Sequence, residues 1–151
     1  MITVYLVQHG MALDKELDEN RPLSDAGAAE VRKVAALLKN NAVVINKIVH
    51  SGKLRASQTA ELFAEALNVD NITELSGIKP NDDPQKLIAQ MTEDALMVIG
   101  HLPNMENVAA ALLQADKNTT PVKFQNSAVA CVVIDKNETY LKWFITPDLC
   151  L

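Results

Sequence analysis

The sequence predicts an α/β protein, a three-layer α/β/α sandwich with a mostly parallel central sheet. Two apolar runs, residues 2–7 and 95–99, have no polar face and therefore indicate central strands covered on both sides. Segments with helical spacing of apolar residues alternate with strands, and two further apolar runs close the chain. Because single hydrophobic cores are usual at 151 residues, we expect one domain spanning residues 1–151.

The first half of the chain alternates strand and helix patterns. The run at residues 2–7 gives the first strand. Ser24 is a suitable cap for the helical pattern that follows and continues to about Lys39. Residues 47–50 indicate a short second strand, and the next helical pattern stops at Asn68.

The middle of the chain contains a loop and a short helix. Residues 73–83 include Gly77 and Pro80, so we expect a loop there. Residues 84–91 indicate a short helix that begins with a proline in its first turn. The fully apolar strand at residues 95–99 follows.

The last third of the chain predicts a helix and a β-hairpin. Apolar residues with helical spacing run from Pro103 to Leu113. Residues 128–134 and 139–145 are apolar runs separated by four polar residues, which is typical of a hairpin. A hairpin that follows alternating strands and helices fits the predicted three-layer fold.

Composition and charge argue against several kinds of partner. The net charge of -5 makes electrostatic binding to nucleic acid or to a membrane surface improbable. Cys131 and Cys150 lack the spacing of a redox motif or a zinc site, and unpaired thiols suit a reducing compartment. Residues 1–7 are too short for a membrane span or a signal peptide. We therefore expect a cytoplasmic protein without a metal or a cofactor.

Three strand ends of the predicted sheet carry residues suited to chemistry. His9 follows the first strand, Arg55 lies soon after the second, and His101 follows the strand at residues 95–99. Ligands of open α/β sheets bind outside the carboxyl ends of the strands, so these side chains should meet at one edge. Two imidazoles and a guanidinium can surround a tetrahedral anion, which predicts a phosphoryl-transfer site.

Motifs along almost the whole chain resemble one family. They are residues 4–10 (VYLVQHG), 20–24 (NRPLS), 51–59 (SGKLRASQT), 99–103 (IGHLP) and 126–128 (NSA). This combination resembles the histidine phosphatase superfamily, which has a phosphoglycerate mutase-like fold. The short length and the lack of a large inserted lid are similar to SixA-type phosphohistidine phosphatases. The resemblance implies a compact phosphatase that acts on a phosphorylated protein and needs no metal or cofactor.

The resemblance also implies a role for each site residue. His9 would be the nucleophile that forms a covalent phosphohistidine. Arg55 would clamp the phosphoryl oxygens, and His101 would donate to them as charge builds. Arg21 could add a second guanidinium from its loop, or it could pair with an acidic residue on the surface.

Position 8 departs from the family motif Arg-His-Gly, because this chain has Gln8. Glutamine can bind a phosphoryl oxygen but supplies no charge, and a charge-assisted hydrogen bond contributes roughly 1.5–3 kcal/mol. Transition-state stabilisation could therefore fall by about ten- to a hundred-fold. Gly52 stands where proline is usual, a change we expect only to loosen the loop.

No clear proton donor for the leaving group stands out. Larger family members hold a carboxylate there, whereas this chain offers only Asp82 and Asp83, with Glu74 further away. A phosphohistidine substrate explains that lack, since a protonated imidazole leaves readily while an alkoxide needs a proton.

Three functions therefore compete. The first is a phosphohistidine phosphatase for a signalling or phosphotransfer protein. The second is a non-catalytic module that binds phosphate or a phosphoprotein, in which Gln8 marks lost activity. The third is a phosphatase for a small phosphate monoester, which would need an acid near the pocket.

Several nearby polar residues have simpler structural explanations. His50 lacks motif support and is expected to be a partly buried structural residue. Ser24 is better explained as a helix cap than as a nucleophile. Gln58 is expected to form structural hydrogen bonds, and Lys53 to be solvated.

Overall fold

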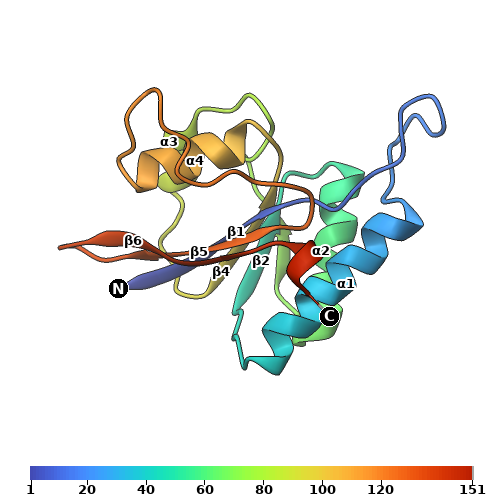
Figure 1. Cartoon of the computed structure of the whole chain (residues 1–151), viewed down its shortest axis with the longest axis horizontal. Helices are drawn as coiled ribbons and strands as arrows, with labels where there is room; N and C mark the ends of the chain where they lie inside the picture. Colours follow the sequence, from blue (N-terminus) through green and yellow to red (C-terminus); the bar gives the residue numbers. More distant parts are fainter. Residues whose placement is uncertain (151) are drawn as a thin grey trace.

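The computed structural model describes residues 1–150, in which strands and helices alternate before a terminal hairpin (Figure 1). The strands are β1 (Ile2–Gln8), β2 (Lys47–His50), β3 (Ile72–Glu74), β4 (Leu96–Gly100), β5 (Val129–Ile134) and β6 (Thr139–Ile145). The helices are α1 (Asp25–Asn40), α2 (Leu54–Leu67), α3 (Pro84–Ile88), α4 (Asn104–Leu112) and the short 3-10 helix η1 (Pro147–Leu149).

All six strands form one sheet in the order β3-β2-β4-β1-β5-β6. The pairs β2–β3, β2–β4 and β1–β4 are parallel. The hairpin is added to the other side of β1, so the β1–β5 and β5–β6 pairs are antiparallel. The prediction of a mostly parallel sheet is confirmed, and the hairpin is its antiparallel exception.

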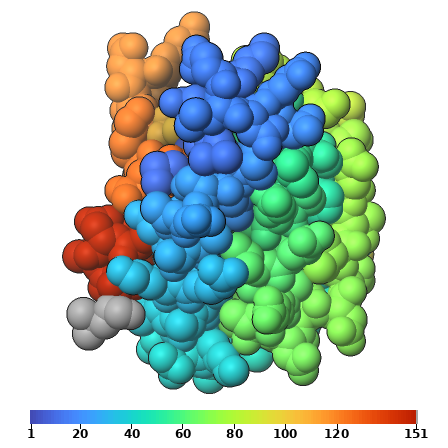
Figure 2. Space-filling model, turned by 90° about the vertical axis from the view of Figure 1, so that its right-hand side faces the viewer, coloured from blue at the N-terminus to red at the C-terminus, as the bar shows by residue number. Residues whose placement is uncertain are grey.

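Helices cover both faces of the sheet and create two cores (Figure 1). Val31 of α1 and Phe63 of α2 are fully buried in the first core. Figure 2 shows these two helices side by side on the outside of that layer, in light blue and green. Leu87 of α3 and Met105 of α4 are fully buried in the second core. The fold therefore has the predicted three layers.

Two predicted elements differ from the structure. The segment expected to be a loop at residues 73–83 begins with strand β3, which has three residues and pairs only with β2. Two of those three residues are exposed, so no run of buried side chains marked the strand in the sequence. Helix α3 ends at Ile88 rather than at residue 91.

The helix ends follow the expected local rules. Ser24 Oγ accepts a hydrogen bond of 2.9 Å from the backbone N–H of Gly27 and caps α1. Asn68 ends α2 in a left-handed conformation with φ 57°. Among residues 1–150, no helix has the length and apolar composition required to cross a membrane.

Candidate active site

The carboxyl ends of β1 and β4 bring two histidines together. These strands are parallel neighbours, with Gln8 opposite Gly100, so the next residue of each strand lies at the same edge. The rings of His9 and His101 are 4.9 Å apart between centroids and tilted by 53°. Strand β2 lies on the far side of β4, and α2, which follows it, carries Arg55 to the same edge. The structure therefore brings together the three residues that the sequence singled out.

His9 is held with one ring nitrogen, Nε2, unprotonated. Its Nδ1 donates to the carbonyl oxygen of Gly10 over 2.6 Å, so the ring proton is on Nδ1 and Nε2 carries a lone pair. The Arg55 Nε–H donates to that Nε2 atom over 3.4 Å. Burial lowers the pKa of His9 to about 4. The charges of Arg55 and Arg21 lower this pKa further, whereas the hydrogen bond to Gly10 raises it. The imidazole is thus neutral at pH 7, as a nucleophile must be.

His101 is also neutral, and it is more deeply enclosed. Only 2% of its surface is exposed. Burial lowers its pKa to about 3, and the neighbouring His9, Arg55, Lys53 and Arg21 act in the same direction. Its Nε2 lies 2.6 Å from Ser51 Oγ, whereas Nδ1 is buried without a hydrogen-bond partner among residues 1–150. This ring can therefore act as a neutral hydrogen-bond donor.

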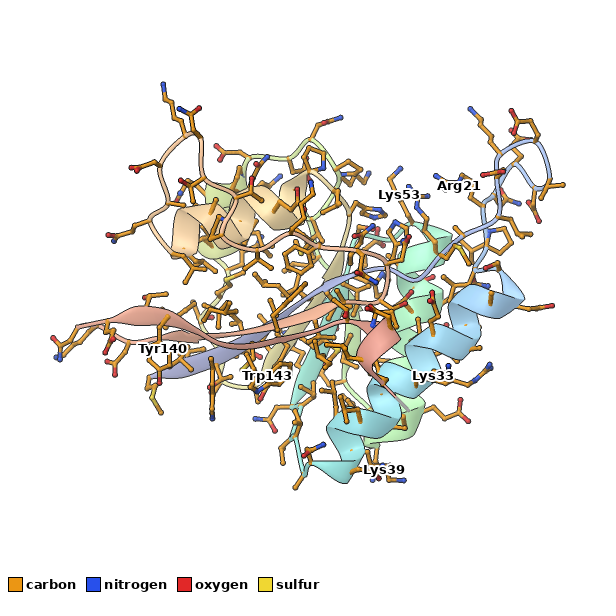
Figure 3. The ribbon with its side chains drawn as sticks, viewed as in Figure 1. Arg21, Lys33, Lys39, Lys53, Tyr140 and Trp143 are labelled. Atoms are coloured by element: carbon orange, nitrogen blue, oxygen red, sulfur yellow. The ribbon has the colours of Figure 1, made fainter. Side chains whose placement is uncertain are left out.

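Arg21 approaches the site from the loop between β1 and α1. That loop is folded back by an isolated bridge between Ala12 and Leu23. Arg21 has φ 48°, and its Nε donates to the carbonyl oxygen of Leu13 over 3.0 Å. Its charge helps to lower the pKa of Arg55 as well as those of the two histidines. Figure 3 shows Arg21 at the same end of the molecule as Lys53, which precedes α2.

Arg21 does not form the surface ion pair considered from the sequence. Within residues 1–150 the ion pairs join Lys47 to Glu93 and Lys123 to Glu106. The guanidinium therefore remains available to an anion at the site.

Gln8, next to His9 in the sequence, has a polar but uncharged side chain. Its Oε1 atom is buried and has no hydrogen-bond donor among the described residues. Such an atom loses water without gaining a partner, which is unfavourable. The amide oxygen is therefore poorly satisfied by the described residues.

One hydroxyl and one amide group that we did not assign from the sequence hydrogen-bond to the backbone around His9. Thr59 Oγ1 accepts from the Gly10 N–H over 3.0 Å and donates to the Arg55 carbonyl over 2.7 Å, linking the two segments. Asn126 Nδ2 donates to the His9 carbonyl over 3.0 Å. Both residues lie inside the motifs at 51–59 and 126–128, so the motifs contained a signal for them.

The residues given structural explanations behave as expected. The His50 Nδ1 accepts from the Gly52 N–H over 3.1 Å. Gln58 Oε1 accepts from the Leu23 N–H over 2.8 Å. Asp82 and Asp83 accept from backbone N–H groups of their own loop and of α3, so both have structural partners.

Gly52 matters more than the sequence suggested. Its φ of +90° lies in a region that side chains rarely adopt, and the Glu74 carboxylate occupies the place of a Cβ atom. Our expectation that this glycine only loosens the loop is therefore wrong. Glycine permits both the backbone conformation and the close approach of the Glu74 side chain.

We expect Gly52→Ala to lower the free energy of unfolding by about 1–2 kcal/mol, because an L-residue is strained at positive φ. Urea denaturation of both proteins measures this difference. Because the Glu74 carboxylate can swing away, adding Glu74→Ala should recover only a small part of the loss. Full recovery in the double variant would show that side-chain contact, not the backbone, requires glycine here.

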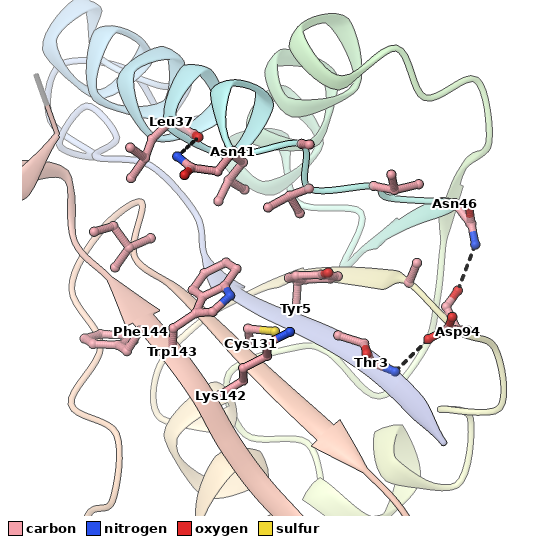
Figure 4. A pocket seen from close by; sticks show the side chains of 16 residues that line it. Thr3, Tyr5, Leu37, Asn41, Asn46, Asp94, Cys131, Lys142, Trp143 and Phe144 are labelled. Carbon is pink, nitrogen blue, oxygen red and sulfur yellow. Dashed lines mark hydrogen bonds between the residues drawn. The ribbon is translucent and has the colours of Figure 1, made fainter.

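A separate cavity of about 730 Å³ lies between the end of α1 and the terminal hairpin (Figure 4). Tyr5 and Trp143 form part of its wall, and Lys142 reaches it from β6. None of the site residues predicted from the sequence lines it. A smaller cavity of about 430 Å³ adjoins the candidate site at Ser51.

Comparisons with known proteins agree on the family. The model described as the histidine phosphatase superfamily (branch 1) matches residues 4–79. The phosphohistidine phosphatase SixA of Escherichia coli (strain K12) is 34% identical over 154 residues, covering 95% of this chain and 93% of that protein.

Solved structures agree on the fold. The structure of the protein histidine phosphatase SixA complexed with tungstate superposes with a TM-score of 0.86 at 31% identity, covering 97% of this chain and 98% of the other. The alpha-ribazole phosphatase of Shigella flexneri superposes with a TM-score of 0.79, covering 97% of each chain. At 12% identity the second match shows a common fold alone.

Proposed function

This chain belongs to the histidine phosphatase superfamily, and we propose that it removes the phosphoryl group from phosphohistidine on a protein, through a covalent intermediate on His9. The observation that carries the proposal is the state of His9. Its Nδ1–H donates a hydrogen bond to the Gly10 carbonyl oxygen, its Nε2 accepts one from Arg55, and burial lowers its pKa to about 4. An unprotonated, oriented nitrogen next to a cation is what nucleophilic attack on a phosphoryl group requires.

The reaction has two displacements at phosphorus. In the first, the His9 Nε2 lone pair forms a P–N bond while the bond from phosphorus to the substrate imidazole breaks. The substrate ring carries a proton on its other nitrogen, so it leaves as neutral imidazole. In the second, water attacks the phosphoryl group on His9. The P–Nε2 bond breaks, inorganic phosphate leaves with the protons of the water, and His9 regains its lone pair.

The neighbouring groups bind the charge on the transferring group. Arg55 and Arg21 supply two guanidinium groups, and His101 supplies a neutral donor. Such preoriented donors act where charge develops in the transition state. Gln8 contributes a neutral amide at the position where the family motif has arginine. The tungstate bound by the SixA relative is a tetrahedral oxyanion and supports an oxyanion site here.

A phosphohistidine substrate fits the lack of a proton donor. Asp82 and Asp83 are engaged with backbone N–H groups, and the Glu74 side chain packs against Gly52. A leaving imidazole needs no acid beyond its own ring proton, whereas an alkoxide does. The similarity to a phosphohistidine phosphatase over 95% of the chain favours the same substrate class. The partner would be a phosphorylated signalling or phosphotransfer protein.

We expect turnover of a phosphohistidine peptide to exceed that of a matched phosphoserine peptide by at least about a hundred-fold, since general-acid help is worth roughly 10²–10⁴-fold. Release of phosphate from both peptides and from small sugar phosphates measures the difference in kcat/KM. A faster reaction with a small phosphate ester would favour a small-molecule phosphatase instead.

One observation favours a second function, a phosphoprotein-binding module without turnover. Gln8 removes a cation from the site, and its buried Oε1 lacks a partner. In that case the wild-type protein would bind a phosphohistidine peptide. It would release phosphate from that peptide no faster than the His9→Ala variant does. Binding measured by calorimetry beside turnover separates the two functions.

A further inference from the structure

Ser51 and His101 meet at the ends of neighbouring parallel strands. Strand β2 pairs with β4 so that His50 lies opposite Ile99, and Ser51 directly follows β2. Both Ser51 and His101 are only 2% exposed. The 2.6 Å separation between Ser51 Oγ and His101 Nε2 is a short hydrogen bond between two buried side chains. Nothing in the phosphoryl-transfer steps above uses this serine.

The surrounding hydrogen bonds indicate which atom carries the proton. The Lys53 N–H donates to Ser51 Oγ over 3.3 Å, so that oxygen already accepts one bond. Within residues 1–150 the hydroxyl proton of Ser51 has no acceptor other than His101 Nε2. If Nε2 held the ring proton, the buried hydroxyl proton and the Nδ1 lone pair would both lack partners. If Ser51 donates to Nε2 instead, the Nδ1–H group is the one group left without a partner among the described residues. That arrangement costs less free energy.

Resting on the proposed function, we propose that Ser51 is a positioning residue that fixes His101 in the tautomer with its proton on Nδ1, and that this N–H group binds a phosphoryl oxygen. The buried Nδ1 atom has no protein partner among the described residues, so a phosphoryl oxygen would satisfy it. In the opposite tautomer, Nδ1 would present a lone pair to the anion, and the two would repel. Ser51 thus allows the neutral His101 ring to donate a hydrogen bond from Nδ1 to the phosphoryl group.

The tautomer can be measured in the unmodified protein. Nitrogen NMR of protein labelled at histidine distinguishes a protonated from an unprotonated ring nitrogen, with His101→Gln used for assignment. We expect a protonated Nδ1 and an unprotonated Nε2 on His101. A protonated Nε2 in the wild-type protein would overturn the proposal. The tautomer itself is read on the wild type, and the variant serves only to assign the signal.

Substitution then tests whether the tautomer matters to the reaction. We expect Ser51→Ala to lower kcat by roughly five- to ten-fold, the effect of one lost hydrogen bond, with a smaller change in KM. The same variant should show both His101 tautomers and a raised His101 pKa, because the hydroxyl donates to the neutral ring only. Ser51→Thr keeps the hydroxyl and should retain the tautomer.

A matched control comes from helix α2, which begins three residues after Ser51. Ser57 Oγ donates to the carbonyl oxygen of Leu54 and contacts neither histidine, so Ser57→Ala should change neither the tautomer nor kcat. If Ser51→Ala leaves both quantities unchanged, Ser51 has no positioning role. The tautomer is read without substrate, so an Nδ1–H signal in a protein that shows no turnover would refute the phosphatase function while leaving the positioning of His101 by Ser51 in place.

Discussion

His9→Ala should abolish turnover, with a loss of about 10⁴-fold or more in kcat, the scale seen when a covalent nucleophile is removed. Its Nε2 is the one ring nitrogen at the site held unprotonated beside the Arg55 guanidinium. The ring lies at the edge of the sheet and not inside either hydrophobic core. We therefore expect an unchanged circular dichroism spectrum and a similar unfolding midpoint, measured beside phosphate release.

A matched histidine provides the control. His50 ends strand β2 of the same sheet. Among residues 1–150 its side chain hydrogen-bonds to the Gly52 N–H alone, so His50→Ala should retain most of the activity. Labelled substrate, quenched without acid because phosphoramidates are acid-labile, should place the phosphoryl group on His9 in the wild type. Recovery of the label on a serine, or substantial turnover by His9→Ala, would remove the covalent step from the mechanism.

The layers and the site edge could be predicted because their signals are local. Residues 4–7 of β1 and all five residues of β4 are buried, and both strands appear in the sequence as short apolar runs. Once both strands are parallel, His9 and His101 must share an edge. Strand β3 gave no such signal, because it is three residues long and largely exposed.

The finer features depend on contacts between distant segments. The need for Gly52 comes from its backbone conformation and from Glu74, which lies on another strand. The proton position on His101 depends on Ser51, 50 residues away in the chain. Periodicity and motif spacing carry no information on either contact. They become visible only when the strands are placed side by side.

Gln8→Arg is expected to raise kcat/KM for phosphohistidine by roughly one to two decades. The substitution places a guanidinium beside the transferring phosphoryl group, and a charge-assisted hydrogen bond contributes about 1.5–3 kcal/mol. It also removes the buried amide oxygen that lacks a donor. Inhibition by inorganic phosphate should strengthen in parallel, so phosphate Ki and turnover are measured together.

The increase in kcat/KM expected for Gln8→Arg depends on Arg21. Its charge already lowers the pKa of His9, Arg55 and His101, so a further guanidinium beside it adds like-charge repulsion. Turnover and phosphate inhibition of the wild type, Gln8→Arg, Arg21→Ala and the double variant form a cycle that isolates this coupling. If Arg21 occupies the space the new side chain needs, Gln8→Arg alone will lose activity and the double variant will recover it. An unchanged rate in Gln8→Arg would instead mean that position 8 contributes little and that Arg55, Arg21 and His101 already supply the charge the phosphoryl group requires.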